Sequence, residues 1–498
     1  DTDRSRGLGD VYKRQILQKY LVDIIFTRSG YKMKKDDLNK KQRYALDTML
    51  SGSNVFLTGD AGTGKTTVIQ TFIDEAEKAG KSVLVSATTG IAADNIGYGA
   101  TTVHRALNIS IKFEDYKKKV KSRAELLKEA DVLIIDEISM CRFDLFNMIA
   151  KTIITENEDR AVDRLLIGED KEDVQLIVIG DFYQLPPVVT TDDRKILCRM
   201  YGSDYGKGGK YEHGYAFMSE YWKDMAFEYI KLDEVCRQND EGFKYVLNDI
   251  KYGNNIRKSI AYLENNESDK VIPEAPFLVG TNAEADRINN TFLGKLNKKT
   301  EKVFHAAVDG ELTSADIKNI AFAREDLILN VGAKVMITVN DLSGNYVNGT
   351  IGIIQKIVDN GEFEESYLVI KTDKGKTVNL YRYSKDIEKQ VIEESEQEKD
   401  GQKIVKEKIV RKKVGSFSQF PVKLAWAISI HKSQGQTFEK INIDPCCWDP
   451  GQFYVAVSRA KSANGIHFIR PIKQSYIKAF SKDNERLLEQ SFEVEEGV

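Results

Sequence analysis

The segment from Asn54 to Val68, NVFLTGDAGTGKTTV, has the residue types and spacing of a phosphate-binding loop, with Gly59, Gly64, Lys65 and Thr66 at the defining positions. Glycines let several backbone N–H groups converge on one anion, and the following helix adds the positive end of its dipole. The lysine of such a loop reaches the β- and γ-phosphates, and the threonine hydroxyl holds Mg²⁺. The segment therefore predicts a nucleoside-triphosphate site formed by Gly59, Ala61, Gly62, Thr63, Gly64, Lys65, Thr66 and Thr67.

Two adjacent carboxylates end an apolar run further along the chain, in DVLIIDEIS. Asp136 and Glu137 follow the predicted strand directly, and α/β proteins bind ligands at this carboxyl edge of the sheet. We expect Asp136 to complete the Mg²⁺ shell and Glu137 to act as the general base toward the attacking water. An acidic pair at a strand end is common by itself, but after a phosphate-binding loop it indicates a site that hydrolyses the nucleotide.

Two glutamines are candidates for contacts to the nucleotide. Gln184 lies in LIVIGDFYQLPPV, after a third apolar strand, where an amide could contact water and the γ-phosphate together. Gln42 lies just upstream of the loop, in LNKKQRYAL, where its amide could read the adenine edge. An exposed helix glutamine is an equally good interpretation of Gln42 taken alone.

Two arginines of the second half of the chain could complete the site. Arg237 lies in LDEVCRQND and Arg459 lies in FYVAVSRAKS. If both reach the γ-phosphate across a cleft, they act as arginine fingers and couple hydrolysis to closure of two domains.

Polar residues at predicted loop and helix starts suit contacts to nucleic-acid phosphates without base reading. Taken singly, each could equally cap a helix. The candidates are Thr88, Thr89, Gly90, Thr102, His104, Thr281, Asn282, Asn348, His431, Lys432 and Ser433.

Two α/β patterns position these residues. Apolar β-branched runs at residues 55–57, 83–86, 132–135 and 176–179 alternate with helical segments and predict a parallel sheet. A second set of predicted strands lies at residues 277–279, 334–337, 424–429 and 466–469. Between its halves, residues 351–420 alternate apolar and polar residues with charged turns, which is typical of a small antiparallel module.

Composition narrows the class of protein. At ~150 residues per domain, 498 residues suggest roughly three domains. Lys+Arg 73 against Asp+Glu 76 excludes a generally cationic DNA-coating protein, so any nucleic acid needs a local basic channel. The chain has five cysteines and no CxxC pair, which favours a reducing environment. We expect a cytoplasmic protein of a bacterial or phage-like setting, and a eukaryotic organelle stays open as an alternative. No apolar run of ~20 residues predicts a membrane span.

Taken in order, these motifs resemble the superfamily-one DNA helicases, and most of all the petite-integration-frequency (PIF) branch. The resemblance covers Leu38 to about Arg470 and is carried by GDAGTGKTT, ATTGIAA, TTVH, LIIDEISM, GDFYQLPPV, CRQND, TN-x-x-AD, VNGTIG, LAWAISIHKSQG and YVAVSRA. It departs between LIIDEISM and GDFYQLPPV, where the family usually has an Arg followed by a Pro–Phe–Gly–Gly-like signature and this chain reads RAVDRLLIGEDKEDVQ.

The resemblance implies an α/β fold of two RecA-like P-loop domains, with ATP and Mg²⁺ in the cleft between them and single-stranded DNA across both. It adds Gly435 to the nucleotide site. We expect the first domain at residues 36–232, with a wedge insertion near 108–128. The second domain is expected at 233–350 and 419–485, and a small β-barrel inserted at 351–418. Residues 1–35 are expected to be a non-native or disordered leader, and 486–498 a tail.

The resulting hypothesis is a monomeric ATP-dependent DNA helicase that moves 5′ to 3′ by family resemblance and unwinds tailed or forked duplexes. G-quadruplex DNA is a further candidate substrate. Two alternatives stay open: a nucleic-acid-binding switch that hydrolyses ATP without separating strands, and an RNA translocase.

Overall fold

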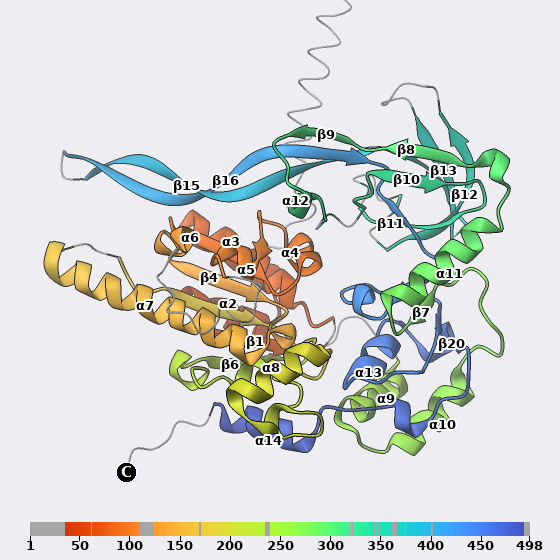
Figure 1. Cartoon of the computed structure of the whole chain (residues 1–498), viewed down its shortest axis with the longest axis horizontal. Helices are drawn as coiled ribbons and strands as arrows, with labels where there is room; N and C mark the ends of the chain where they lie inside the picture. The colour runs from red at the N-terminus through yellow and green to blue at the C-terminus, as the bar shows by residue number, and fades with distance from the viewer. Residues whose placement is uncertain are drawn as a thin grey trace, which may run out of the picture.

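A computed structural model describes residues 35–492 apart from 61, 110–123, 169–170, 235–239, 319, 321, 340, 342–344, 347–348, 360–365, 374 and 400–401. Within this part of the chain, two parallel-sheet domains lie side by side (Figure 1). Antiparallel sheets lie above them, and one long hairpin crosses over the first domain. All of the predicted leader except its last residue, Lys35, and most of the predicted wedge fall outside the described residues.

The first domain contains a six-stranded parallel sheet in the order β3-β2-β4-β5-β1-β6. β1, β2 and β5 are buried along their whole length, which explains their continuous apolar sequences. The strands are β1 Val55–Gly59, β2 Val83–Ala87, β3 Thr101–Thr102, β4 Val132–Asp136, β5 Gln175–Ile179 and β6 Glu228–Leu232. The helices are α2 Lys40–Leu50, α3 Lys65–Lys78, α4 Gly90–Ile96, α5 Val103–Ala106, α6 Glu125–Lys128, α7 Phe143–Ile167 and α8 Thr191–Tyr201.

The second domain contains a four-stranded parallel sheet in the order β18-β7-β19-β20. Its strands are β7 Phe277–Val279, β18 Ala427–Ser429, β19 Ile441–Ile443 and β20 Ile466–Phe468. Its helices are α9 Glu241–Tyr252, α10 Ile256–Asn266, α11 Asn282–Gly294 and α13 Gln452–Val457. Short 3₁₀ turns in the two domains and their connections are η1 Lys35–Asp37, η3 Ile138–Met140, η4 Ser203–Tyr205, η5 Ala216–Met218, η6 Lys223–Met225, η7 Lys298–Thr300, η8 His431–Ser433, η9 Ala463–Gly465 and η10 Gln474–Tyr476.

The assignment of residues 334–337 to the second parallel sheet is wrong. They form β11 Lys334–Ile337 in a five-stranded antiparallel sheet, order β14-β13-β12-β11-β17. The predicted strand at 424–429 is two strands, β17 in the antiparallel sheet and β18 in the parallel sheet. The continuous apolar sequence hides the change of sheet, because apolar periodicity does not identify a strand's partner. The other strands of this sheet are β12 Ile351–Val358, β13 Tyr367–Thr372, β14 Thr377–Tyr381 and β17 Val422–Leu424.

The antiparallel region also begins earlier than the predicted residue 351. β8 Lys302–His305 pairs with β10 Asp326–Leu329, and β9 Ala307–Gly310 pairs with the long hairpin of β15 Tyr383–Lys399 and β16 Gln402–Gln419. Helix α12 Ser314–Lys318 lies between these strands in the sequence.

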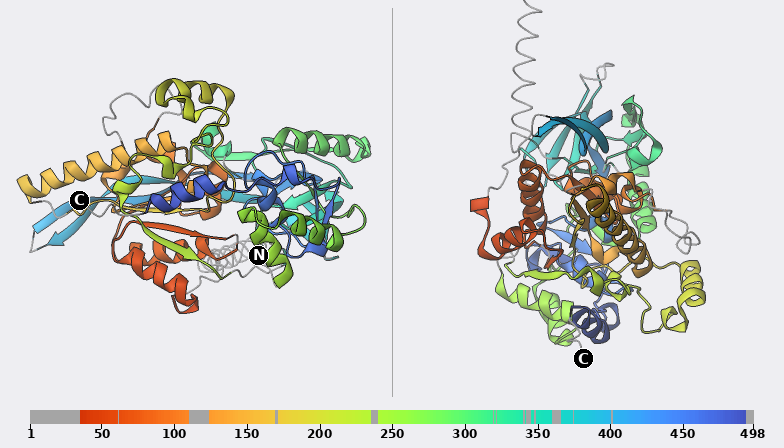
Figure 2. Two further views of the ribbon diagram at one scale, coloured as in Figure 1. Left: turned by 90° about the horizontal axis from the view of Figure 1, so that it is seen from below. Right: turned by 90° about the vertical axis from the view of Figure 1, so that its left-hand side faces the viewer.

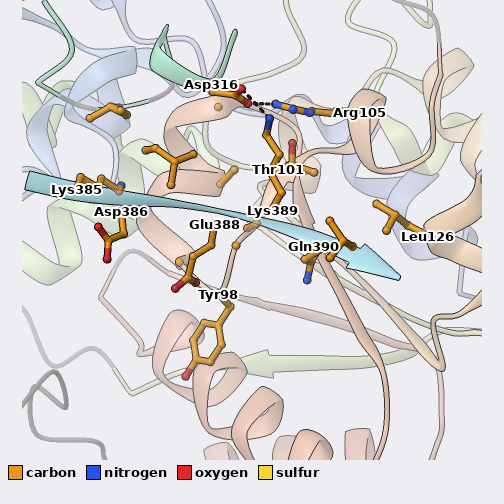
Figure 3. Close-up of a pocket in the computed structure, with 18 residues that line it drawn as sticks. Tyr98, Thr101, Arg105, Leu126, Asp316, Lys385, Asp386, Glu388, Lys389 and Gln390 are labelled. Atoms are coloured by element: carbon orange, nitrogen blue, oxygen red, sulfur yellow. Dashed lines mark hydrogen bonds and ion pairs between the residues drawn. The ribbon is translucent and has the colours of Figure 1, made fainter. Parts of the chain in front are cut away.

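The β15–β16 hairpin contacts the first domain (Figures 1 and 2). Gln390 Nε2 donates to Val83 O at 3.0 Å, and Val85 N donates to Gln390 Oε1 at 3.3 Å, so this amide covers the edge of β2. Asp316 of α12 accepts ion pairs from Arg105 at 2.5 Å and from Lys389 at 2.9 Å. A cavity of about 400 Å³ lies between the hairpin and the first domain, beside these contacts (Figure 3).

The end of the described chain returns to the first domain. Helix α14 Lys482–Gln490 lies against it, so the predicted boundary of a tail at residue 486 falls inside a helix. Beyond this helix, the Phe492 ring stacks on Phe56 of β1 at 5.9 Å between centroids. The acidic composition of this end did not indicate the contact.

Candidate nucleotide site between the two domains

The loop between β1 and α3 has the predicted strand–loop–helix context. Val68, Ile69, Phe72, Ile73 and Ala76 of α3 are buried, as their helical spacing predicts. Glycine is required at two positions. A Cβ on Gly59 would lie 2.6 Å from Leu232 O, and a Cβ on Gly64 would lie 2.5 Å from Gln42 Nε2. The backbone is therefore packed too closely for a side chain at Gly59, and glycine is favoured at Gly64 by its positive φ of 84°. Ala61 lies outside the described residues.

Lys65 and Thr66 begin helix α3. The Lys65 ammonium donates to Gly59 O at 2.7 Å and to Asp60 O at 3.1 Å, so it folds back over the loop. Burial lowers the pKa of Lys65, while the charges of Asp181, Glu137 and Asp136 oppose that shift. Thr66 is exposed on the first turn of the helix. These are the positions from which an ammonium and a hydroxyl can meet a phosphate and its metal ion.

Gln42 lies beside the loop, as predicted, and its amide contacts protein groups. Its Nε2 donates to Thr63 O at 3.0 Å, and its Oε1 accepts from Asn39 N at 3.1 Å. The second bond belongs to a capping box at the start of α2. Gln42 therefore positions the phosphate-binding loop, and its contact with adenine stays a prediction.

Asp136 and Glu137 lie at the carboxyl end of β4, facing the loop. Asp136 Oδ1 accepts from the Glu137 backbone N–H at 2.8 Å, and Glu137 has a positive φ of 54°, which is costly for a residue with a side chain. Burial raises the pKa of Asp136 to about 6. Burial and the neighbouring Asp136 raise the pKa of Glu137 to about 7, while Lys65 and Arg459 act in the opposite direction. A carboxylate with a raised pKa suits a general base.

These residues fit ATP and Mg²⁺. The loop supplies backbone N–H groups and the Lys65 ammonium for phosphates, and its close packing leaves no room for a side chain at Gly59. The Thr66 hydroxyl and the Asp136 carboxylate are oxygen donors, which Mg²⁺ prefers.

Gln184 is buried on the loop after β5, and its Nε2 donates to Asp181 Oδ2 at 3.2 Å. Asp181 also pairs with Lys251, a buried lysine of α9 in the second domain, at 3.3 Å between Nζ and Oδ2. Lys251 additionally pairs with Asp60 of the phosphate-binding loop. Lys251 belongs to none of the sequence motifs, although one signal was present. It follows the apolar stripe Phe243, Val246, Leu247 and Ile250 on the buried face of its helix.

Arg459 lies on the second-domain side of the same site and is 1% exposed. Its Nε donates to Val455 O at 2.9 Å and its Nη2 donates to Ser458 Oγ at 2.9 Å. Its positive charge lowers the pKa of Glu137 on the first domain, so the two groups interact electrostatically across the domain boundary. Arg237 lies outside the described residues. The finger role of both arginines stays a prediction.

The candidate DNA-contacting residues of the first domain lie at carboxyl ends of parallel strands. Thr88 Oγ1 donates to Glu137 O at 2.8 Å, which links this loop to the predicted base. Thr89 caps α4 by accepting from Ala92 N at 3.2 Å, and Gly90 begins that helix. Thr102 precedes α5, which carries His104, whose pKa is lowered by burial.

The second-domain candidates follow β7 and β18 in the same way. Thr281 caps α11 by accepting from Glu284 N at 3.1 Å, and Asn282 Oδ1 accepts from Ser429 Oγ at 2.5 Å. The turn η8 carries the exposed Lys432 and the half-buried His431. Ser433 is buried and donates to Ile430 O at 2.7 Å, so in this structure it supports the turn from inside. Gly435 follows this turn with a φ of 76°. Asn348 lies outside the described residues.

Comparisons with known proteins place the chain in a family. The sequence profile described as PIF1-like helicase matches residues 37–259. The ATP-dependent DNA helicase Pif1 of Campylobacter jejuni is 29% identical over 447 residues, covering 84% of this chain and 89% of that protein. The crystal structure of Bacteroides sp. Pif1 in complex with ADP-AlF4 is 30% identical, covers 91% of this chain and 96% of the other, and superposes with a TM-score of 0.69. The chain belongs to the PIF1-like helicase family.

A second structure of this PIF1-like helicase family, Bacteroides Pif1 bound to ssDNA, is 30% identical with the same coverage of 91% and 96% but has a lower TM-score of 0.56. The unliganded structure of Bacteroides sp. Pif1 has the same TM-score as the ADP-AlF4 complex, 0.69, so this chain superposes better on these two structures than on the complex with ssDNA. In the part of the chain that the structure describes, none of the helices combines the length with the apolar composition that a membrane span needs.

Proposed function

We propose that this chain is an ATP-dependent DNA helicase that moves along single-stranded DNA in the 5′ to 3′ direction and separates tailed or forked duplexes. The observation that carries the proposal is the meeting of two domains at one phosphate-binding loop. Lys65, Asp136, Glu137 and Gln184 come from the first domain, and the buried Arg459 comes from the second. Family membership supports the activity, since relatives and structural neighbours carry the name Pif1 helicase.

The chemistry requires a nucleophilic water and a stabilised γ-phosphate. In the proposed mechanism, the Lys65 ammonium, which contacts the carbonyls of Gly59 and Asp60, would bind the phosphate oxygens, and Thr66 and Asp136 would hold the metal ion. Glu137 removes a proton from the attacking water, because its raised pKa lets the carboxylate accept it. Gln184 orients that water through its amide. Mg²⁺, when bound, would neutralise part of the negative charge on the phosphates.

Coupling to movement follows from the placement of the DNA-contact candidates on both domains. Thr88 is joined to Glu137 by a hydrogen bond, so a change at the base can reach the DNA side of the same domain. Separating each base-pair step costs ~1.4 kcal/mol, so long duplexes need repeated cycles of closure and opening. Solved structures of related Pif1 helicases, one bound to ssDNA and one concerned with unwinding at forked dsDNA, support these substrates.

The test compares strand separation of 5′-tailed and 3′-tailed DNA duplexes with and without ATP. We expect ATP-dependent separation of the 5′-tailed substrate only. Separation of only the 3′-tailed substrate would reverse the polarity. ATP hydrolysis without separation would instead favour the nucleic-acid-binding switch, and equal stimulation by RNA would favour an RNA translocase. ATP-dependent unfolding of a G-quadruplex would test whether the specificity extends to this DNA structure. Analytical ultracentrifugation would test the proposed monomeric state.

Replacing Lys65 tests the nucleotide site itself. We expect Lys65→Ala to lower DNA-stimulated ATP hydrolysis at least about 100-fold, because a preorganised positive donor to the transition state is lost. Single-stranded DNA binding, measured by fluorescence anisotropy, should stay near the wild-type level. Lys78→Ala, at the exposed end of the same helix, is the matched control. Wild-type turnover by Lys65→Ala would remove this loop from the mechanism.

A further inference from the structure

One buried lysine crosses the boundary between the domains, and the mechanism above does not use it. Lys251 belongs to α9 of the second domain and is 3% exposed. Its ammonium pairs with Asp60 on the phosphate-binding loop and with Asp181 on the loop after β5, both in the first domain. Helix α9 therefore delivers a positive charge directly to the nucleotide site.

The environment keeps this ammonium charged. Burial alone would lower the pKa of Lys251, but Asp181 and Asp60 raise it well above its ordinary value. The Tyr183 ring lies 4.7 Å from Nζ, measured to the centroid, and adds a cation–π contact. The same charge also lowers the pKa of Lys65, so the two lysines share one electrostatic environment.

Asp181 connects Lys251 to the predicted water-positioning residue. Its Oδ2 accepts from Lys251 Nζ at 3.3 Å and from Gln184 Nε2 at 3.2 Å. An ionised carboxylate has only acceptors, so the amide nitrogen of Gln184 must face Asp181. The amide oxygen then lies on the opposite side of the carboxamide, and an oxygen is the group that can accept a hydrogen bond from a water molecule.

We propose that Lys251 is a positioning residue for ATP hydrolysis, which holds the Asp181 carboxylate by an ion pair and thereby fixes the orientation of the Gln184 amide. Without this cation, the Asp181 side chain loses its partner from α9, and the acceptor that orients the Gln184 amide is no longer fixed in place. Because Lys251 comes from the second domain, the correct orientation exists only when the domains are together. The inference rests on the proposed role of Gln184.

The test measures kcat and KM for ATP in single-stranded-DNA-stimulated hydrolysis by the full chain. We expect Lys251→Met to lower kcat about tenfold or more, because misplacement of a reacting group is costly, and to change KM less. Lys251→Arg keeps the charge and should retain most of kcat. Lys244→Met, on the exposed face of the same helix, is the matched control and should leave both constants unchanged.

A double-mutant cycle separates positioning from a structural role. If Lys251 acts through Gln184, adding Lys251→Met to Gln184→Ala should lower kcat little beyond Gln184→Ala alone. Independent, multiplicative losses would overturn the proposal, as would a wild-type kcat in Lys251→Met. If Lys251→Met does not fold, Asp181→Asn replaces it, since it conserves shape and introduces a donor. A wild-type kcat in Asp181→Asn would also overturn the proposal.

Glu137→Gln serves to distinguish failure of this inference from failure of the proposed function. Unchanged hydrolysis in Glu137→Gln would place catalysis elsewhere. Loss of hydrolysis in Glu137→Gln with full activity in Lys251→Met would leave the site intact and reject only the positioning role.

Discussion

Gly451 of the second domain lies so close to the first that its position leaves no room for a side chain. It precedes α13, has a φ of 72°, and a Cβ there would lie 2.2 Å from Gln184 O and 2.5 Å from Tyr183 O. The loop that carries Gln184 is thus packed against the backbone at the start of the helix that leads to Arg459. The two domains can approach this closely here only because glycine has no Cβ.

Gly451→Ala should therefore force the domains apart. We expect kcat for DNA-stimulated ATP hydrolysis to fall about tenfold or more, because groups from the two domains lose their alignment. Steady-state kinetics measures the effect. Gly202→Ala is the matched control, because Gly202 also has a positive φ, 105°, but a Cβ there meets nothing within 4 Å. Equal losses in both variants would point to local backbone strain alone.

Glu137 combines a strained backbone, burial and a neighbouring carboxylate. We expect Glu137→Gln to slow hydrolysis by about 100-fold or more while ATP still binds, because the amide keeps the shape and cannot accept the proton. Single-turnover hydrolysis and nucleotide binding, measured separately, check this. Rapid hydrolysis in the variant would remove Glu137 as the base.

At the scale of elements, Lys334 joins β11 of the antiparallel sheet to the segment before β7. Its ammonium donates to Pro273 O at 2.8 Å and to Ala275 O at 2.7 Å, and burial lowers its pKa to about 8. The contact holds the second parallel sheet against the antiparallel sheet with a buried lysine.

Because the pKa of Lys334 is lowered in the folded chain, its contribution to the unfolding free energy depends on pH in a defined direction. Between about pH 8 and 10.5 the unfolded chain binds more protons at this lysine than the folded chain, so its contribution to stability rises with pH. Lys334→Met should flatten the slope of the unfolding free energy against pH in this window, as measured by chemical denaturation. Lys371→Met, at an exposed position of β13 in the same sheet, is the control. Identical slopes in wild type and Lys334→Met would contradict the assignment.

At the scale of the whole molecule, the chain joins its two domains twice more beyond the nucleotide site. The hairpin of the antiparallel region covers the edge of β2 through Gln390. The C-terminal segment returns from the second domain to the first, where Glu485 accepts from Tyr183 Oη at 2.7 Å. The Phe492 ring lies 4.9 Å from Tyr229 and 5.9 Å from Phe56, measured between centroids.

Phe492→Ala should weaken the packing of the C-terminal segment against the first domain. We expect the first domain to lose about 2 kcal/mol of unfolding free energy, less than for a fully buried ring because Phe492 is only partly covered. Thermal denaturation of the full chain, followed at the transition of the first domain, measures the change. Leu165→Ala, at a residue 84% exposed on α7, is the control and should change stability by less than about 0.5 kcal/mol. No change in Phe492→Ala would show that the contact is not stabilising.

Features that depend on neighbouring residues were predictable from the sequence. The phosphate-binding loop needs glycines, a lysine and a threonine within a few residues, and the apolar runs before and after it define its strand and helix. Asp136, Glu137 and Gln184 were predicted by the same reasoning, because carboxyl ends of parallel strands meet at one edge of a sheet. The structure places all of these residues around the loop.

Features that depend on distant partners needed the tertiary structure. The sequence of β11 is apolar in either kind of sheet, so only its pairing with β12 and β17 placed it in the antiparallel one. Lys251 is an ordinary lysine in the sequence until folding sets it beside Asp60, 191 positions away. A buried charge requires an opposite charge nearby in space, and the sequence alone does not specify which residue will supply it.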